Sequence, residues 1–213
     1  MDRRGHGASG DSQEYSLQKE SEDVAAVVDS LPDPVFVVGH SYGAVCALEA
    51  AFVTHNISKL VLYEPPVQER NHSAVASRME SLIRARQREQ ALTVFLQEVV
   101  MISPTEIEAM KSRPSWANLA TGIDSQIRRL RALDAYRFDQ KKISSLEIPI
   151  LLLTGSKTAS PDLKRATEIL TATLPNCRVI VFEGQEHNAM DTIPQKFAEA
   201  VSKFLLETDS KSD

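Results

Sequence analysis

The residues most able to do chemistry in this chain are a serine flanked by glycines and a histidine far downstream of it. Gly39-His40-Ser41-Tyr42-Gly43 has the form G-x-S-x-G, and it lies between an apolar run and an Ala- and Leu-rich segment. The motif requires that strand–turn–helix setting, because the turn lifts the serine hydroxyl clear of the sheet. Glycines are expected beside it because larger side chains would collide with the strand and the helix. The pattern predicts Ser41 as a nucleophile.

The neighbours of Ser41 are candidates for holding charge on the reacting oxygen. The helix that follows the turn directs amide N–H groups and the positive end of its dipole toward developing negative charge. The Tyr42 amide is therefore the expected oxyanion donor. His40 is the second candidate for an oxyanion or substrate contact, although a side chain at its place in such a turn is expected to point elsewhere.

His187 is the predicted catalytic base. It follows the last apolar run of the chain and precedes the last helical segment. A histidine can take the proton of a serine and return it to a leaving group near neutral pH. Among the other histidines, His6 is interpreted as structural, and His55 and His72 are expected at the surface.

The elements that must position these residues alternate between helices and strands. Apolar runs rich in Val, Ile and Leu predict buried strands, and amphipathic or Ala-rich segments predict helices. The strands are expected at 35–38, 60–63, 148–153 and 179–182, and the helices at 16–30, 44–54, 162–173 and 192–206. This alternation predicts an α/β fold with a mostly parallel sheet of about four strands, covered on both faces. Functional residues should then follow the carboxyl ends of the strands.

The chain is expected to divide into four parts. Residues 1–66 form the first part of the core with the serine turn, 143–206 complete it, and 207–213 form a flexible tail. Between them, residues 67–142 lose the strand pattern and predict a helical cap insertion. Apolar residues there, such as Trp116, are expected to pack the helices rather than line a pocket. The arginines at 84–88 and 128–131 are expected on solvated helix faces.

The composition excludes several classes of protein. The chain has 213 residues, 42% of them hydrophobic, and a net charge of -5, which is typical of a globular protein and gives no reason to expect nucleic acid or an anionic membrane as partner. No run approaches the roughly 18 apolar residues of a membrane span, and no apolar stretch follows the charged start as in a secretory signal. Cys46 and Cys177 are interpreted as small buried hydrophobes in a reducing, cytoplasmic compartment.

From its first residue to about Leu206, the chain resembles the α/β-hydrolase superfamily. The opening Asp2-Arg3-Arg4-Gly5-His6-Gly7-Ala8-Ser9, the Ser41 turn, Leu62-Tyr63-Glu64-Pro65-Pro66 and the segment around His187 carry this resemblance. It implies a serine hydrolase of a small ester or related acyl bond. Ser41 would attack and His187 would relay the proton, in the chain order that the superfamily uses. No metal or organic cofactor is implied.

The third member of the catalytic group departs from the superfamily pattern. The acid usually lies in the loop after the strand that is here 150–153, but Thr158 holds that position. A hydroxyl can orient the base but cannot stabilise its charged form. Glu64, at the end of the preceding strand, and Asp162, at the start of a helix, are the two candidate substitutes, and Glu64 is favoured. Their other interpretations are a buried hydrogen bond and a first-turn charge.

A second departure is that the chain resembles the last four of about eight strands. The loop that gives the second oxyanion amide is missing from it, and one such donor contributes ~3 kcal/mol to transition-state stabilisation. Strand 35–38 would then be an exposed apolar edge, through which a homodimer could form. The alternative hypothesis is therefore a catalytically impaired fragment or a non-catalytic binding member of the same fold.

Overall fold

A computed structural model describes residues 1–32, 35–67 and 71–207 of the chain. It divides into two compact units. The helical unit comprises Met1–Asp23 and Gln68–Phe138, and the sheet unit comprises Val24–Val67 and Asp139–Asp213. Nearly all of the predicted tail, residues 207–213, lies outside the described residues. The division into 1–66, a cap at 67–142 and 143–206 stays a proposal about the roles of these segments.

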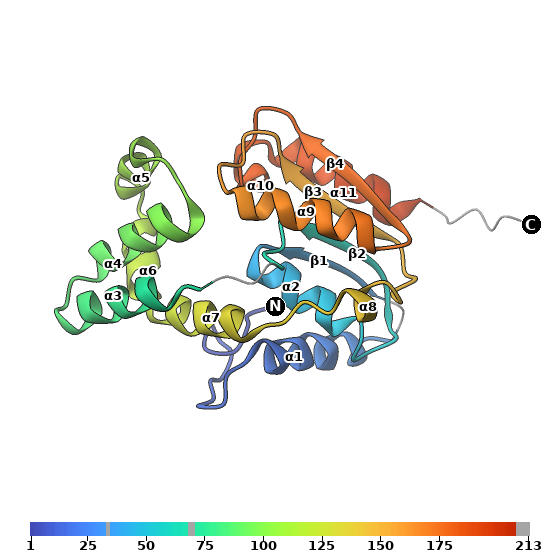
Figure 1. Ribbon diagram of the computed structural model, residues 1–213, viewed down its shortest axis with the longest axis horizontal. Coiled ribbons are helices and arrows are strands. Elements are labelled where there is room, and N and C mark those ends of the chain that lie inside the picture. Colours follow the sequence, from blue (N-terminus) through green and yellow to red (C-terminus); the bar gives the residue numbers. More distant parts are fainter. Residues whose placement is uncertain (33–34, 68–70, 208–213) are drawn as a thin grey trace, which may run out of the picture. The chain divides into compact units, whose positions relative to one another are not determined.

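The sheet unit contains a four-stranded parallel sheet in the order β1-β2-β3-β4, whose strands run from blue to orange in Figure 1. Its strands are β1 (Val35–His40), β2 (Ile57–Tyr63), β3 (Ile150–Gly155) and β4 (Cys177–Phe182). The predicted parallel sheet of four strands is confirmed. Strand β3 begins two residues later than predicted, at Ile150, because Pro149 lacks an N–H for a sheet hydrogen bond.

Among the described residues, six helices have all or part of their length in the sheet unit. They are α1 (Leu17–Asp29), α2 (Tyr42–Ala50), α8 (Gln140–Ile143), α9 (Pro161–Thr173), α10 (Ala189–Thr192) and α11 (Pro194–Leu206). Helix α1 and helix α9 match their predicted ranges closely. The helix predicted at 192–206 is α11, which begins two residues later, because Pro194 has no N–H to continue α10 and instead occupies the first turn of α11.

The two faces of the sheet are covered by different helices. Val61, Tyr63, Leu151 and Leu153 alternate along β2 and β3 on one face, where they share a buried cluster with Phe204 of α11 and neighbouring residues. Helix α2 packs on β1 and β2, and α9 packs on β3 and β4. In Figure 1, α9 lies in front of the sheet and α11 behind it. The alternation of side chains along each strand therefore fixes the face of the sheet on which each residue packs.

The strand predicted at 35–38 was expected to be buried, and this is wrong: Val35 and Val37 are half-buried, and Phe36 and Val38 are exposed. Phe36 is 44% exposed and Val38 is 48% exposed. Among the described residues, β1 has β2 as its one neighbour in the sheet. An apolar run specifies a strand, but its burial depends on what covers it from elsewhere in the chain. The structure thus gives the exposed apolar edge that the resemblance led us to expect.

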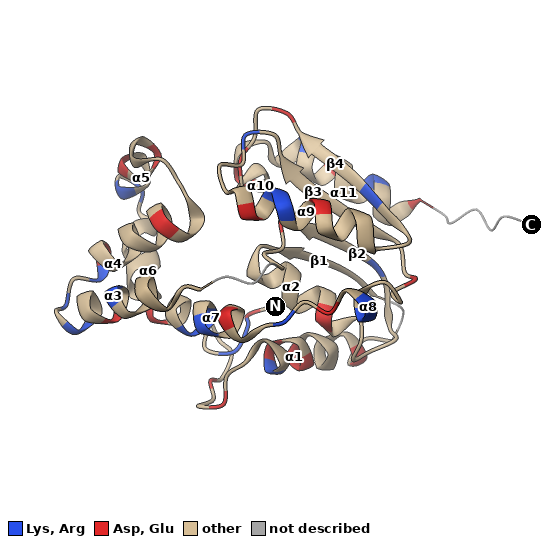
Figure 2. Cartoon of the chain, in the orientation of Figure 1, with Lys and Arg blue, Asp and Glu red and all other residues tan. Residues whose placement is uncertain are grey.

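The sheet carries few charged residues, and most of the Lys, Arg, Asp and Glu side chains lie on helices and loops (Figure 2). Lys59 of β2 is an exception, because it is buried at 6% exposure. Its Nζ donates to the carbonyl oxygens of Phe204 at 3.2 Å and Glu207 at 2.5 Å. The ammonium thereby caps the carboxyl end of α11, where a positive charge is favourable. Cys46 is buried as predicted, whereas Cys177 is partly exposed.

The helical unit contains α3 (Ser73–Arg84), α4 (Arg88–Phe95), a π-helical turn η1 (Leu96–Val100), α5 (Pro104–Lys111), α6 (Ser115–Thr121) and α7 (Asp124–Ala135). A single buried cluster includes Met79, Leu92, Ile107, Trp116 and Ile123. The predicted helical character of this segment is confirmed, and Trp116 packs in its core. No helix in the described ranges is both long and apolar enough to cross a membrane.

Two predictions for the helical unit are wrong. His72 is not at the surface but 5% exposed, with its Nδ1 2.5 Å from Oδ1 of Asp134 and its backbone N–H donating to the same carboxylate. Arg128 and Arg129 are also partly buried rather than solvated. Arg128 pairs with Asp11, and Arg129 contacts His6. Both arginines contact residues of the opening loop, 1–16, and they are partly buried because these polar partners lie far away in the sequence but close in the fold.

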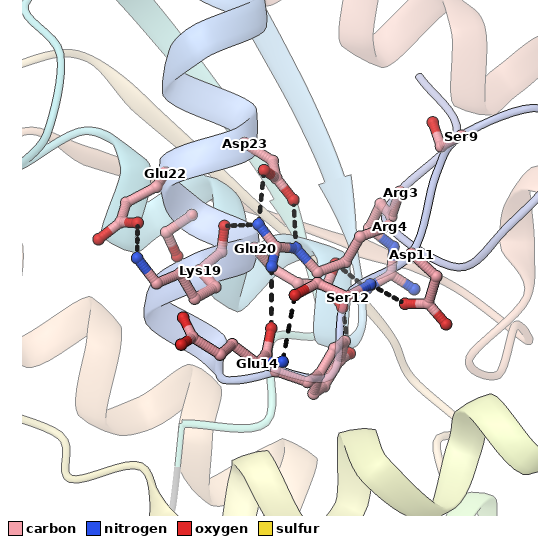
Figure 3. A network of polar contacts seen from close by, with 12 residues as sticks. Arg3, Arg4, Ser9, Asp11, Ser12, Glu14, Lys19, Glu20, Glu22 and Asp23 are labelled. Atoms are coloured by element: carbon pink, nitrogen blue, oxygen red, sulfur yellow. Dashed lines mark hydrogen bonds and ion pairs between the residues drawn. The ribbon is translucent and has the colours of Figure 1, made fainter.

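The opening loop, residues 1–16, is held by a network of ion pairs with the start of α1 (Figure 3). Arg4 donates to both carboxylate oxygens of Asp23, at 2.6 and 2.7 Å, and to the carbonyl oxygen of Glu14. Arg3 pairs with Glu20, which is 1% exposed and also accepts a hydrogen bond from Tyr15. The Asp23 carboxylate raises the pKa of Arg4. The bidentate geometry fixes the loop more firmly than a single surface ion pair would.

Candidate active site

Ser41 lies in a strained turn between β1 and α2. Its backbone has φ 53° and ψ -127°, a conformation that non-glycine residues seldom adopt. Its N–H donates to the carbonyl oxygen of Tyr63 on β2 at 2.9 Å, and its own carbonyl oxygen accepts from the amide of Ala44. The side chain makes no capping hydrogen bond to α2. Strain of this kind costs about 1–3 kcal/mol and is retained at functional sites.

The two glycines of the motif differ in whether their surroundings leave room for a side chain. A Cβ on Gly39 would lie 2.6 Å from the Cα of Ala44, so the close passage of strand and helix requires glycine there. A Cβ on Gly43 would meet no atom within 4 Å. The expectation that both glycines avoid collisions therefore holds for Gly39 and is wrong for Gly43.

Glu64 follows β2 directly and is buried completely at the carboxyl edge of the sheet. Its Oε1 accepts three hydrogen bonds, from the Thr154 hydroxyl at 2.9 Å, the Gly155 N–H at 2.8 Å and the Thr158 hydroxyl at 2.5 Å. Its Oε2 lies 2.5 Å from Nδ1 of His187. Both oxygens of the carboxylate are therefore engaged, and each has a different kind of partner.

Two opposing effects act on the ionisation of Glu64. Burial alone would raise its pKa, because a charged carboxylate loses its hydration. The hydrogen bonds from His187, Thr158 and the Gly155 amide favour the charged form and outweigh burial, so the pKa lies below its ordinary value. The group is thus a carboxylate, and it can only accept hydrogen bonds.

The backbone of Glu64 is also unusual, with φ 46°. Its N–H donates to the carbonyl oxygen of Leu153 at 3.1 Å, which extends the pairing of β2 with β3 by one residue. The positive φ then ends the strand. Ser41 and Glu64 are the two non-glycine residues with positive φ at this edge of the sheet, among the residues that the structure describes.

His187 lies in the loop 183–188 between β4 and α10, named here the histidine loop, and is 9% exposed. The loop packs tightly on the end of β3. A Cβ on Gly155 would lie 2.4 Å from the carbonyl oxygen of Gln185, so only glycine permits this approach. The Lys157 N–H also donates to the Gln185 carbonyl at 2.8 Å, and the Gly184 N–H donates to the Ser156 hydroxyl at 2.8 Å.

Tyr63, the last residue of β2, forms hydrogen bonds with the backbone on both sides of His187. Its ring is fully buried, and its hydroxyl donates to the carbonyl oxygen of Glu186 while accepting from the N–H of Ala189 at 3.2 Å. These two groups lie on either side of His187 in the sequence. Burial raises the pKa of Tyr63 to about 12, so the hydroxyl keeps its proton and can serve as donor.

His40, directly before Ser41, contacts His187 in two ways. Their ring centroids are 4.5 Å apart, and Nε2 of His40 donates to the backbone carbonyl of His187 at 2.9 Å. Burial lowers the pKa of His40 to about 4, and the nearby His187 contributes. His40 is therefore a neutral donor that ties the Ser41 turn to the histidine loop, and its side chain faces that loop.

The contact with Glu64 defines which nitrogen of His187 can act as a base. A carboxylate only accepts, so Nδ1 of His187 must carry the hydrogen in this contact. In the neutral ring, the other nitrogen, Nε2, then has the free lone pair. That is the tautomer a general base needs to take a proton from a serine.

The remaining predicted site residues, Tyr42 and Asp162, each lie in the first turn of a helix. Tyr42 is buried in the first turn of α2, where the helix dipole is positive. Asp162 lies in the first turn of α9, after the N-cap residue Ser160. Sequence reasoning did not identify the contacts of Tyr63 and Thr154 with the histidine loop and Glu64. Their positions at the ends of β2 and β3 were the available signal.

No group of three or more His, Cys, Asp or Glu side chains is arranged to hold a metal ion within the described ranges. The titratable groups that contact one another at the carboxyl edge of the sheet are instead the carboxylate of Glu64, the imidazoles of His40 and His187, and the phenol of Tyr63. The arrangement has a strained serine, a histidine of defined tautomer and a buried, ionised acid. Such a set can perform proton transfer and nucleophilic attack.

Comparison with known proteins agrees with this fold. Residues 1–200 match the model of the Alpha/beta hydrolase family, so the chain belongs to the α/β-hydrolase family. An α/β hydrolase from Sphaerobacter thermophilus is similar in structure, with a TM-score of 0.81 and 28% identity, covering 96% of this chain and 80% of that one. A search of curated protein sequences gives no significant match.

Two structures described as esterases have a similar fold at lower identity. A thermophilic esterase has a TM-score of 0.74 at 21% identity, covering 96% of this chain and 78% of that chain. An esterase from Exiguobacterium antarcticum has a TM-score of 0.70 at 20% identity, covering 97% and 80%. The predicted α/β-hydrolase resemblance is confirmed at the level of the family and the fold.

Proposed function

We propose that this protein is a serine hydrolase of small carboxylic esters that uses Ser41, His187 and Glu64. The observation that carries the proposal is the 2.5 Å contact between Oε2 of Glu64 and Nδ1 of His187. It makes Nε2 of His187 the basic nitrogen, and the imidazole lies 4.5 Å, centroid to centroid, from the ring of His40, which directly precedes the strained turn at Ser41. The descriptions of two similar structures as esterases support the choice of substrate class.

The proposed reaction has two halves. Nε2 of His187 takes the proton of the Ser41 hydroxyl as its oxygen attacks the ester carbonyl, and the Tyr42 amide donates to the resulting oxyanion. His187 then returns the proton to the departing alcohol, leaving an acyl group on Ser41. A water molecule, deprotonated by the same imidazole, attacks the acyl group; the bond to Ser41 breaks, the acid is released, and the imidazolium returns its proton to the Ser41 oxygen. Glu64 stays ionised and stabilises the imidazolium in both halves.

Glu64 is the acid in this proposal, and Asp162 is not required. The buried carboxylate of Glu64 faces the imidazole, whereas Asp162 has a sufficient role as a negative charge in the first turn of α9. A catalytic acid needs both an orienting hydrogen bond and a charge, and the depressed pKa of Glu64 supplies the charge.

The test is hydrolysis of p-nitrophenyl esters of increasing acyl length, with wild type compared with Ser41→Ala. We expect wild-type turnover that falls to background in Ser41→Ala, with both proteins equally folded by circular dichroism. Absence of turnover by folded wild type across acetate, butyrate and octanoate would contradict the proposal. That result would favour a non-catalytic binding member of the family.

We also propose that the exposed edge of β1 pairs with the same edge of a second copy. Phe36 and Val38 give that edge an apolar surface, and β1 has β2 as its one described neighbour. Antiparallel pairing of two such edges would hydrogen-bond the backbone groups that face outward.

A further inference from the structure

Thr158 holds the position where the superfamily resemblance leads one to expect an acid, and it contacts the acid that we propose instead. Its side chain is 2% exposed. The hydroxyl donates to Oε1 of Glu64 at 2.5 Å, and the Thr158 N–H lies 3.3 Å from the carbonyl oxygen of Gly155. The tight turn after β3 therefore aims the hydroxyl at the carboxylate.

The three donors to Oε1 have a geometric consequence for Glu64. Thr154, Gly155 and Thr158 all belong to the end of β3 or the turn after it, and all three point at the same oxygen. Oε1 thus accepts hydrogen bonds from three donors of one short segment, and Oε2 remains to contact His187. A glutamate side chain has three rotatable bonds, so without such donors its carboxylate would sample several orientations.

We infer that Thr158 is a positioning residue for the proposed reaction: its hydroxyl holds the Glu64 carboxylate in the orientation and charge state in which Oε2 serves His187. This inference rests on the proposed function and assigns the hydroxyl a definite part in it. The hydroxyl does not replace the missing acid, because it cannot carry the negative charge that an imidazolium needs. It instead allows an acid from the neighbouring strand to act.

Thr158→Val removes the hydroxyl and nearly keeps the shape, and Thr158→Ser keeps the hydroxyl. With a p-nitrophenyl ester, we expect kcat of Thr158→Val to fall about tenfold with KM within about twofold, since a hydrogen bond to a charged group is lost. Thr158→Ser should keep activity within about threefold of wild type. Thr173→Val is the matched control, because it removes a buried hydroxyl that donates to the Ile169 carbonyl of α9, and it should leave kcat unchanged.

The second readout is the ionisation of Glu64, measured by ¹³C NMR of protein labelled at the glutamate carboxyl carbon, with Glu64→Gln to identify the signal. Loss of a donor to the carboxylate should move its titration midpoint to higher pH in Thr158→Val and not in Thr158→Ser. A role in packing alone would leave the midpoint unchanged. Thr158→Ala provides the same comparison if the valine variant does not fold.

These readouts separate the inference from the proposed function. A wild-type protein without esterase activity would contradict the proposed function, whereas the NMR midpoint would still report on Thr158. A midpoint in Thr158→Val equal to that of wild type, or a kcat within twofold of wild type in an active enzyme, would overturn the inference.

Discussion

Replacing Glu64 with glutamine should lower kcat/KM by about 10⁴-fold, because it changes the tautomer of His187. The hydrogen bonds of the site determine how the new amide must lie. Thr154, Gly155 and Thr158 present donors to Oε1. The Gly155 N–H can only donate, so an amide NH₂ group placed there would meet a donor, and the amide oxygen therefore takes that position.

The NH₂ group of the glutamine would then face Nδ1 of His187. Since NH₂ can only donate, Nδ1 must become the acceptor and the ring hydrogen must move to Nε2. A ring with hydrogen on Nε2 cannot take the proton of Ser41. A loss of about 10⁴-fold corresponds to roughly 5.4 kcal/mol of transition-state stabilisation, at about 1.36 kcal/mol per factor of ten.

The assay is steady-state hydrolysis of p-nitrophenyl acetate, with thermal unfolding as the check on folding and ¹⁵N NMR of His187 as the check on the tautomer. Asp162→Asn is the matched control, because it makes the same change of charge in the first turn of α9, and it should stay within about threefold of wild type. A folded Glu64→Gln variant with more than a tenth of wild-type activity would refute the reasoning. So would an equal loss in Asp162→Asn.

Four further predictions follow from the same geometry. Tyr63→Phe keeps the ring but removes two hydrogen bonds to the backbone on either side of His187. We expect kcat to fall about tenfold with KM nearly unchanged, and the free energy of unfolding in urea to fall by about 1–2 kcal/mol. An unaltered kcat would contradict this. Gly155→Ala places a methyl group 2.4 Å from the Gln185 carbonyl oxygen, so the free energy of unfolding should fall by about 1–3 kcal/mol by the same method. The depressed pKa of Glu64 means that its stabilising contribution is complete above its ordinary value of 4.5 and is lost as pH falls through the lower folded-state pKa. In chemical unfolding measured from pH 7 to pH 3, the free energy of unfolding of wild type should exceed that of Glu64→Gln, and this difference should shrink only at acidic pH. A difference that stays constant over this pH range would count against an ionised Glu64. Val38→Lys should lower self-association in sedimentation velocity without changing the fold, because a charged residue on an exposed edge strand opposes pairing; equal sedimentation of variant and wild type would argue against the edge-paired dimer.

The motif and the order of elements could be predicted from the sequence because both are local. The apolar runs, the glycine before Ser41 and the proline-capped helices each depend on a few consecutive residues. Parallel strands then bring their carboxyl ends to one edge, so the nearness of the Ser41 turn, Glu64 and His187 follows from topology alone.

The sequence favoured Glu64 over Asp162 as the acid, but no local feature decided between them. Both follow a strand or open a helix near the same edge of the sheet. Our proposal of Glu64 rests on its contact with His187, its positive φ and the donors at the end of β3 that hold its carboxylate. Such donors are ordinary threonine and backbone groups, and nothing in their sequence marks them.

Burial was the other property that the sequence predicted poorly. Phe36 and Val38 look like core residues, but burial depends on a covering element. His72 and Arg128 look like surface residues, but Asp134 and Asp11, more than sixty and a hundred positions away in the chain, pair with them. A partner of opposite charge lowers the cost of burying a polar group, and its position is set by tertiary structure.

The most direct test of the central claim, that Ser41 is a nucleophile activated by His187, is covalent labelling with a fluorophosphonate probe followed by mass spectrometry of the peptides. We predict that one probe attaches to the peptide containing Ser41, and that labelling disappears in Ser41→Ala and slows at least a hundredfold in His187→Gln. Failure of the probe to label folded wild-type protein would contradict the account. Labelling of Ser41→Ala at the wild-type rate would contradict it as well.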